Sequence, residues 1–180
     1  MQKILNEELG RLSVDEFKAA TKIPLIIVLD NVRSAMNVGS IFRTADAFLI
    51  RGIYLCGITT VPPHKEVLKT ALGATDTVQW HYFESTKKAI EKLKEDGYKV
   101  LSVEQVNGAF SPQNFIVKTG EMIALVFGHE VNGVDQEIVS LSDACIEIPQ
   151  AGTKHSLNID RKSTRLNSSH VSESRMPSSA

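Results

Sequence analysis

The 180-residue sequence has two cysteines, one tryptophan and no apolar run near the ~20 residues that a membrane-spanning helix needs. It also shows no secretory signal pattern, so we expect a cytoplasmic protein without a membrane partner. Cys56 and Cys145 lie in separate apolar runs, which predicts two buried free thiols rather than a disulfide. An apolar content of 42% is typical of a globular domain with a core.

Several site signatures are also missing. There is no glycine–lysine phosphate loop, no G-x-G-x-x-G fingerprint, no Cys/His spacing for zinc and no G-x-S-x-G elbow, so we predict no metal site. The net charge is −1, and residues 160–180 hold four of the 20 basic and two of the 21 acidic residues. The other residues therefore carry sixteen basic against nineteen acidic groups, a net charge of −3. This charge does not favour nucleic-acid binding, although a local basic patch is compatible with it.

Short apolar runs rich in Val, Ile and Leu alternate with amphipathic helical patterns. The runs cover residues 23–29, 52–58, 77–83, 98–103, 122–127 and 144–149. The helical patterns cover residues 38–50, 65–72, 85–96 and 134–141. This alternation predicts one α/β domain with a mostly parallel, doubly wound sheet.

These patterns divide the chain into three parts. Residues 1–22 are expected to be a helical lead-in, where Ser13 and Glu16 fit a capping box and Phe17 is an apolar anchor. Residues 23–159 form the predicted domain. Residues 160–180 contain seven serines and no aromatic residue, and we interpret them as a disordered, foreign extension, with a natural disordered tail as the alternative.

The first candidate site loop spans residues 30–43, after the first apolar run. Asn37 and Gly39 are placed where a helix is expected to begin, where free backbone N–H groups could meet an anion. Arg43 lies within an otherwise apolar helix, which favours a phosphate or carboxylate partner. The alternative for Arg43 is a surface side chain that extends past the core.

Two further loops follow later apolar runs. In residues 127–133, Gly128 allows a ligand to approach the backbone, and Glu130 could order a loop, bind a ligand hydroxyl or hold Arg43. Plain turn chemistry is the alternative there. In residues 148–158, Ser156 and Asn158 could face a reacting centre, and the loop could hold a polar cofactor largely by its main chain.

Together the three loops resemble the motifs of SpoU-type RNA 2′-O-ribose methyltransferases, which belong to the SPOUT superfamily. The matching patterns are Asn37-x-Gly39-x-x-x-Arg43, then Leu125-Val126-Phe127-Gly128-His129-Glu130-x-x-Gly133, then Ile148-Pro149-x-x-Gly152-x-x-x-Ser156-Leu157-Asn158. The resemblance covers residues 24–158. It implies an α/β fold with a C-terminal trefoil knot and a homodimer whose site lies near the subunit interface.

The resemblance also implies a cofactor, a substrate and site residues. S-adenosylmethionine would be bound in the knot, and the implied cofactor-binding residues are Gly128, Ile148, Leu157, Leu125 and Glu130. The implied catalytic residues are Arg43, Asn37, Glu130, Ser156 and Asn158. Because guanidinium groups keep their proton in water, we favour a phosphate-clamping and alkoxide-stabilising role for Arg43 over that of a base. The substrate would be RNA, with tRNA favoured over rRNA.

One departure from the family pattern concerns the segment after Asn158. Family members continue into an apolar helix that completes the knot, whereas this chain continues with Ile159 and the serine-rich residues. At ~25 cal/mol per Å², several hundred Å² of uncovered apolar surface would remove most of a net stability of ~5–15 kcal/mol. We therefore expect an incomplete knot and an unstable or weakly active protein. The rival functions are a catalytically inactive RNA-binding knot protein and a generic nucleotide-binding domain.

Overall fold

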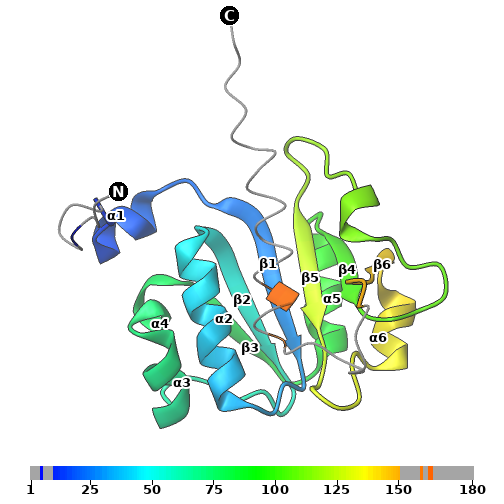
Figure 1. Ribbon diagram of the computed structural model, residues 1–180, viewed down its shortest axis with the longest axis horizontal. Coiled ribbons are helices and arrows are strands. Elements are labelled where there is room, and N and C mark those ends of the chain that lie inside the picture. The colour runs from blue at the N-terminus through cyan, green and yellow to red at the C-terminus, as the bar shows by residue number, and fades with distance from the viewer. Residues whose placement is uncertain (1–4, 6–9, 151–158, 160–161, 164–180) are drawn as a thin grey trace, which may run out of the picture.

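The computed structural model describes residues 5, 10–150, 159, 162 and 163. They form a three-layer α/β arrangement, with one sheet between two groups of helices (Figure 1). Its strands are β1 (Ile23–Asp30), β2 (Ile50–Cys56), β3 (Trp80–Phe83), β4 (Lys99–Val103), β5 (Ile123–Phe127) and β6 (Ala144–Ile146). All pairs are parallel and the order is β3-β2-β1-β5-β4-β6, which confirms the predicted α/β class and parallel sheet.

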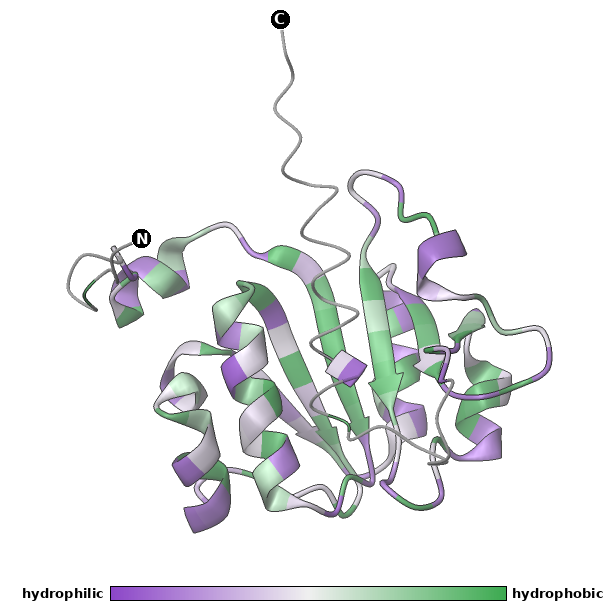
Figure 2. Ribbon diagram, in the orientation of Figure 1, coloured by the Kyte–Doolittle hydropathy of each residue, from purple (hydrophilic) through white to green (hydrophobic). Residues whose placement is uncertain are grey.

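Helices cover both faces of the sheet. The front face in Figure 1 carries α2 (Ala35–Ala47), α3 (Lys65–Ala71) and α4 (Ala74–Thr77), and the back face carries α5 (Thr86–Glu95) and α6 (Gln136–Leu141). A short α1 (Val14–Ala19) precedes β1, and a 3₁₀ turn, η2 (Pro112–Asn114), lies between β4 and β5. Because a parallel sheet is buried on both faces, β1 and β5 are apolar along almost their whole length (Figure 2).

Alternate residues of β1 divide the interior into two cores. Leu25, Ile27 and Leu29 pack with the buried faces of α2 and α3, whereas Ile26 and Val28 pack with α5 and α6. This alternation follows from the two-residue period of a strand. The sheet is thereby fixed between its helices, and its strand ends form a rigid platform for the loops beyond them.

The expected elements are all present, but several boundaries differ by two or three residues: β2 is shifted to residues 50–56, β6 ends at Ile146, α6 begins at Gln136 and α2 ends at Ala47. Two of the shifts have a clear local cause. Helix α2 begins at Ala35 rather than at residue 38, because Ser34 caps it and accepts a hydrogen bond from the Asn37 backbone N–H. Strand β3 begins at Trp80 rather than at residue 77, because α4 occupies residues 74–77 after a left-handed turn at Leu72 and Gly73. The predicted capping box of Ser13 and Glu16 is confirmed at α1.

Strand β6 is enclosed on both edges. It pairs with β4 on one side, and on the other Phe110 forms a parallel bridge with Ile146. The backbone N–H of Phe110 donates to the Cys145 carbonyl, and the backbone N–H of Glu147 donates to the Phe110 carbonyl. The connection from β4 to β5 therefore passes along the outer edge of the last strand.

Ordered structure continues beyond that strand at three described positions. Ile159, Lys162 and Ser163 have helical backbones. Ile159 is buried in the core on the α2 side of the sheet, and Ser163 is fully buried. Buried contacts thus extend past the third motif.

Candidate functional site

The candidate site lies at the carboxyl ends of β1 and β5, which are neighbours in the sheet. After β1 the chain turns to α2 on the front face, and after β5 it turns to α6 on the back face. The two loops therefore separate at a topological switch point, the place where open α/β sheets bind ligands.

The Glu130 carboxylate joins these two loops. Its Oε1 accepts hydrogen bonds from the Ser34 backbone N–H at 3.0 Å and from Asn37 Nδ2 at 2.9 Å. Its Oε2 accepts from the Arg33 backbone N–H at 3.1 Å. The anion at the start of α2 is thus a carboxylate of the protein itself, placed where the helix dipole favours negative charge. No hydrogen bond or ion pair joins Glu130 to Arg43 among the described residues.

This environment shifts the ionisation of Glu130. Burial by itself raises the pKa of the carboxyl, but the hydrogen bonds from its own backbone N–H, Ser34, Asn37 and Arg33 outweigh burial and bring the pKa below its ordinary value. Glu130 is therefore ionised at neutral pH, and its charge holds the two loops together.

Two side-chain contacts join the first loop to the segment after β2. The Thr59 hydroxyl accepts from the Val32 backbone N–H at 3.0 Å and lies within hydrogen-bond distance of the Leu29 carbonyl. Asn31 adopts a left-handed backbone with φ of 54°, and its Oδ1 accepts from the Ile58 backbone N–H at 3.1 Å. The loop is held from both neighbouring strands, so its backbone is preorganised.

The second loop is folded tightly on itself. The Gly133 N–H donates to the His129 carbonyl, and His129 Nδ1 accepts from the Val131 backbone N–H at 3.0 Å. A Cβ on Gly128 would lie 2.1 Å from the Gly133 carbonyl carbon. The Gly128 position therefore requires glycine for the close approach of two backbone segments of this loop.

Carboxylates at two strand ends continue the network towards the back face. Glu104, just after β4, accepts from the Val134 backbone N–H at 2.9 Å. Asp30, the last residue of β1, is 2% exposed and accepts from the Thr86 hydroxyl at 2.5 Å and from the Asp135 backbone N–H at 3.2 Å. Asp30 thus ties the start of α5 to the sheet, and both carboxylates tie the approach to α6 to it.

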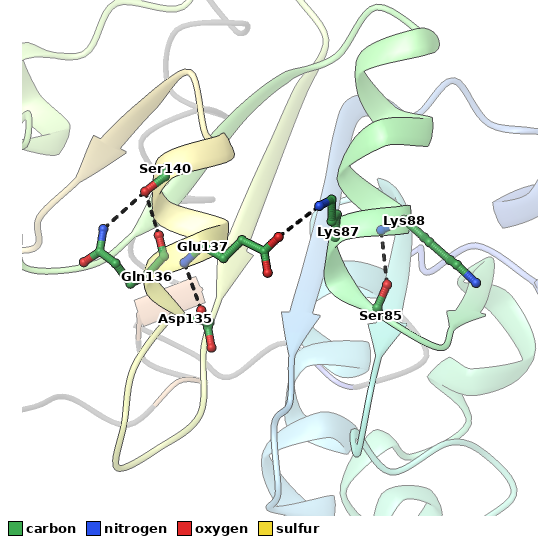
Figure 3. Close-up of polar contacts among 7 residues, drawn as sticks. All are labelled: Ser85, Lys87, Lys88, Asp135, Gln136, Glu137 and Ser140. Atoms are coloured by element: carbon green, nitrogen blue, oxygen red, sulfur yellow. Dashed lines mark hydrogen bonds and ion pairs between the residues drawn. The ribbon is translucent and has the colours of Figure 1, made fainter.

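Exposed polar contacts connect the same two helices (Figure 3). Lys87 of α5 and Glu137 of α6 form an ion pair at 3.0 Å, with side chains that are 51% and 62% exposed. Ser85 and Asp135 cap the two helices by accepting from the backbone N–H groups of Lys88 and Glu137. Exposed pairs of this kind contribute little stability, which makes Glu137 a suitable comparison for Glu130.

Helix α2 carries the other residues of the first motif. Asn37 is buried against Glu130, whereas Arg43 is exposed and has no hydrogen bond or ion pair within the described part of the chain. The interpretation of Gly39 as a free N–H donor at a helix start was wrong, because Gly39 lies inside the helix. A Cβ there would lie 2.0 Å from Thr70 Oγ1 and 2.4 Å from the Val67 carbonyl oxygen, so glycine lets α2 pack closely on α3.

Two of the predicted cofactor-binding residues are buried in the core. Leu125 of β5 and Ile148 after β6 are 3% and 4% exposed, and both belong to the core on the α2 side. Ser156, Leu157 and Asn158 lie outside the described residues. The described part of the site offers apolar side chains, glycine and main-chain groups, which fits a ligand held chiefly by backbone and apolar contacts.

Both thiols are free, as predicted. Cys56 is fully buried, but Cys145 is only half-buried, which corrects the expectation that both are buried. Burial raises the pKa of the Cys56 thiol to about 12, and desolvation also raises that of Cys145. Neither thiol is activated as a nucleophile.

The described residues hold neither a metal site nor a membrane-spanning helix. Within those ranges, no group of three or more His, Cys, Asp or Glu side chains is arranged to hold a metal ion. None of the helices that the structure describes combines the length and apolar character needed to cross a membrane.

Sequence reasoning missed several residues that build the site. Arg33 and Ser34 contribute backbone donors, and Asp30, Thr59 and Glu104 hold the loops in place. A polar residue at the end of an apolar run, as at Asp30 and Glu104, is the one sequence signal that could have indicated them.

Comparisons with known proteins agree with this arrangement. Residues 24–161 match the SpoU rRNA Methylase family. A Staphylococcus saprophyticus protein assigned to the TrmH family of tRNA/rRNA methyltransferases is 29% identical over 145 residues, which make up 81% of this chain and 57% of that protein. The chain thus spans little more than half the length of that relative.

Solved structures share the fold. An rRNA methyltransferase from Sinorhizobium meliloti with bound AdoMet superimposes with a TM-score of 0.75 at 27% identity, over 84% of this chain and 57% of that one. A TrmH/SpoU tRNA-modifying enzyme from A. aeolicus superimposes with a TM-score of 0.74 at 22% identity, over 91% of this chain and 84% of that one.

Proposed function

Because the chain belongs to the SpoU rRNA methylase family, we propose that it methylates a ribose 2′-hydroxyl of RNA in the cytoplasm. Membership confirms the resemblance of the three motifs. The family depends on S-adenosylmethionine, so the expected cofactor is confirmed at the level of the family. The observation that carries the proposal is the Glu130–Asn37 contact, which brings the first and second motifs together over 93 residues of sequence.

The proposed reaction is an in-line methyl transfer. S-adenosylmethionine would supply the electrophilic methyl group on its sulfonium. The ribose 2′-oxygen would form the new bond to that carbon while the sulfur keeps the electron pair of the broken bond, and the hydroxyl proton would pass to solvent. Alignment and charge stabilisation are the protein's part.

Arg43 is proposed to act on the RNA. Its exposed guanidinium stands on α2, outside the core, and has no partner among the described residues. It is therefore available to bind the phosphate beside the target nucleotide and to stabilise negative charge on the 2′-oxygen. Recognition of a 2′-hydroxyl would make the reaction specific for RNA over DNA.

Glu130 and Asn37 are proposed as positioning residues. The carboxylate of Glu130 is occupied by the first loop, so it orders the start of α2 rather than removing a proton. Gly128, Leu125 and Ile148 would form the described wall of the cofactor site. Ser156, Leu157 and Asn158 remain proposals for the third motif, with Leu157 at the cofactor and the other two at the reacting centre.

The partner proposals are a second copy of the chain and RNA. We propose a homodimer in which RNA contacts both subunits, a C-terminal trefoil knot, and tRNA as the favoured substrate over rRNA. The course of the β4–β5 connection along the outer edge of β6 supports a knotted topology, because the last strand then lies within an earlier part of the chain.

Two measurements test the function. Calorimetry with S-adenosylhomocysteine should give micromolar binding, and tritiated S-adenosylmethionine should label tRNA at a ribose.

Arg43→Gln should lower kcat by about 100-fold or more without changing the affinity for S-adenosylhomocysteine. Lys69→Gln, which removes an exposed charge from α3, is the matched control. Full activity of the Arg43 variant would contradict its role, and cofactor binding without any methyl transfer would favour the rival RNA-binding protein.

A further inference from the structure

A basic trough lies at the opposite end of the sheet from the candidate site. Two adjoining concavities of about 430 Å³ and 380 Å³ share Lys18, Thr77 and Gln79 in their linings. They run between α1, the starts of β1 and β2, and β3. In Figure 1, α1 lies at the end of the sheet away from the arrowheads. The residues that line the trough are Lys18, Thr21, Lys22, Arg51, Asp76, Thr77, Val78, Gln79, Trp80 and His81.

The cations of this trough are not neutralised by close carboxylates. Within the described ranges, no carboxylate lies within 4.0 Å of Lys18, Lys22 or Arg51. Asp46 acts on Lys22 only at longer range, and its Oδ2 accepts from the Thr77 hydroxyl. The lining therefore holds three cations and one carboxylate, Asp76, which leaves an excess of positive charge at one edge of a chain whose overall charge is −1.

The lysines of α5 and β4 form ion pairs with nearby acids, whereas Lys65 and Lys69 of α3 form none among the described residues. The pairs are Lys87–Glu137, Lys88–Glu84, Lys92–Asp96, Lys94–Asp143 and Lys99–Glu121. The trough thus combines a concave surface with cations that have no carboxylate within ion-pair distance, although Arg51 donates to the Tyr98 hydroxyl at 3.2 Å and Lys22 to backbone carbonyls.

The lining also offers groups that recognise nucleotides. Trp80 is the single tryptophan of the chain and lines the trough with its side chain half-buried against the core on the α2 side, whereas the exposed His81 packs edge-on against Tyr54. Thr21 and Gln79 add a hydroxyl and an amide. Aromatic side chains beside a basic groove suit unpaired bases, which stack on the rings while cations contact the phosphates.

We propose that this trough binds the sugar–phosphate backbone and an unpaired base of the RNA substrate, remote from the nucleotide that is methylated. The inference rests on the proposed function. Strand β2 alone separates the two ends of the sheet by about 23 Å, from seven residues at ~3.3 Å each, so one nucleotide cannot occupy both places. The trough is therefore a second contact that selects substrates by their extent and shape.

The test compares two double variants of the full chain. Lys18→Gln/Arg51→Gln removes two charges from the trough, and Lys88→Gln/Lys92→Gln removes the same charge from the ion-paired face of α5. Lys22 is left unchanged because its Nζ also binds backbone carbonyls of the α1 region. Calorimetry with S-adenosylhomocysteine and a thermal melt establish that both variants remain folded.

The readouts are the anisotropy of a labelled single-stranded RNA and the fluorescence of Trp80. At about 0.1 M salt, each lost phosphate contact on a single strand lowers affinity about 5-fold, so the trough variant should bind roughly 25-fold more weakly. Its salt slope should fall by about 1.4. RNA should quench Trp80 in the unmodified chain, and the α5 variant should keep both the quenching and nearly all of the affinity.

Each contrary result has a distinct meaning. Equal losses in the two variants, or RNA binding that leaves Trp80 fluorescence unchanged, would overturn the trough as a site. Methyl transfer with an unchanged KM for RNA in the trough variant would overturn the inference while the proposed function stands. An unmodified chain that binds cofactor but neither binds nor methylates RNA would overturn both.

Discussion

Replacing Glu130 with glutamine tests the central contact of the site. The change keeps the side-chain size but converts one acceptor oxygen into a donor. In the better orientation, Oε1 keeps its bonds from Ser34 and Asn37, and the new NH₂ group faces the Arg33 N–H in place of Oε2. At least one charge-assisted hydrogen bond is then lost, and two donors face each other.

The expected cost is about 2 kcal/mol in the free energy of unfolding. A hydrogen bond to a charged group contributes about 1.5–3 kcal/mol, and the lower end applies because Glu130 is only half-buried. Loss of a negative charge near the start of α2 adds roughly 0.5 kcal/mol. With a urea m-value of about 2 kcal/mol per M, the unfolding midpoint should fall by about 1 M.

The pH dependence gives an independent check. Because the pKa of Glu130 in the folded protein lies below its ordinary value, the stability that its carboxylate contributes is complete only above the pKa of an unfolded glutamate, about 4.3. That contribution disappears as the pH falls through the lowered pKa. The stability difference between the unmodified chain and Glu130→Gln should therefore shrink below about pH 4.5 and stay constant above it.

Glu137→Gln is the matched control. It removes a carboxylate whose ion pair with Lys87 is exposed, so the expected loss is at most about 0.5 kcal/mol. The reasoning on Glu130 would be refuted if both variants unfolded at the same urea concentration. It would also be refuted if the stability difference between the unmodified chain and Glu130→Gln stayed the same in acid.

Other substitutions probe the supporting structure. Gly39→Ala should cost about 1–3 kcal/mol in urea unfolding, because its Cβ would lie 2.0 Å from a side-chain atom of α3; unchanged stability would contradict that packing. Asp30→Asn should lower the free energy of unfolding by about 1–3 kcal/mol through its contact with Thr86. In a double-mutant cycle, the same substitution should cost much less in the Thr86→Val background. In native protein at pH 8, maleimide should modify Cys145 faster than Cys56, and equal rates would show that Cys56 is not buried. A cooperative thermal transition well above about 50 °C would contradict the expected low stability of the chain.

The sheet could be predicted because its strands are continuous apolar runs. Burial on both faces leaves little choice of residue, so β1 and β5 appear in the sequence almost as they appear in the structure. The ends of the helices were harder to predict, because they depend on capping residues that the apolar pattern does not show. The apolar stripe of α2 first appears at Val38, whereas the helix begins at Ala35 because Ser34 caps it.

The site could be predicted only in part. Motif spacing placed Asn37 and Glu130 in one site, and the structure joins them directly. The Arg33 and Ser34 contacts are made by backbone N–H groups, which any residue type supplies, so the sequence carries no sign of them. The role of Gly39 could not be predicted either, because it depends on how α2 packs on α3 and the residues around Gly39 in the sequence do not show that packing.

The enclosure of β6 between β4 and Phe110 has a consequence for synthesis of the chain. The first five strands can form before β6 is made, but the position between β4 and the Phe110 segment then stays empty, with unpaired backbone groups on the edge of β4. Such an edge can pair with another chain, so the nascent protein is most prone to aggregate in the interval before residues 144–146 arrive. Pairing of β6 with β4 ends that interval, and it leaves β3, a four-residue strand, at one end of the finished sheet and β6, bridged by Phe110, at the other.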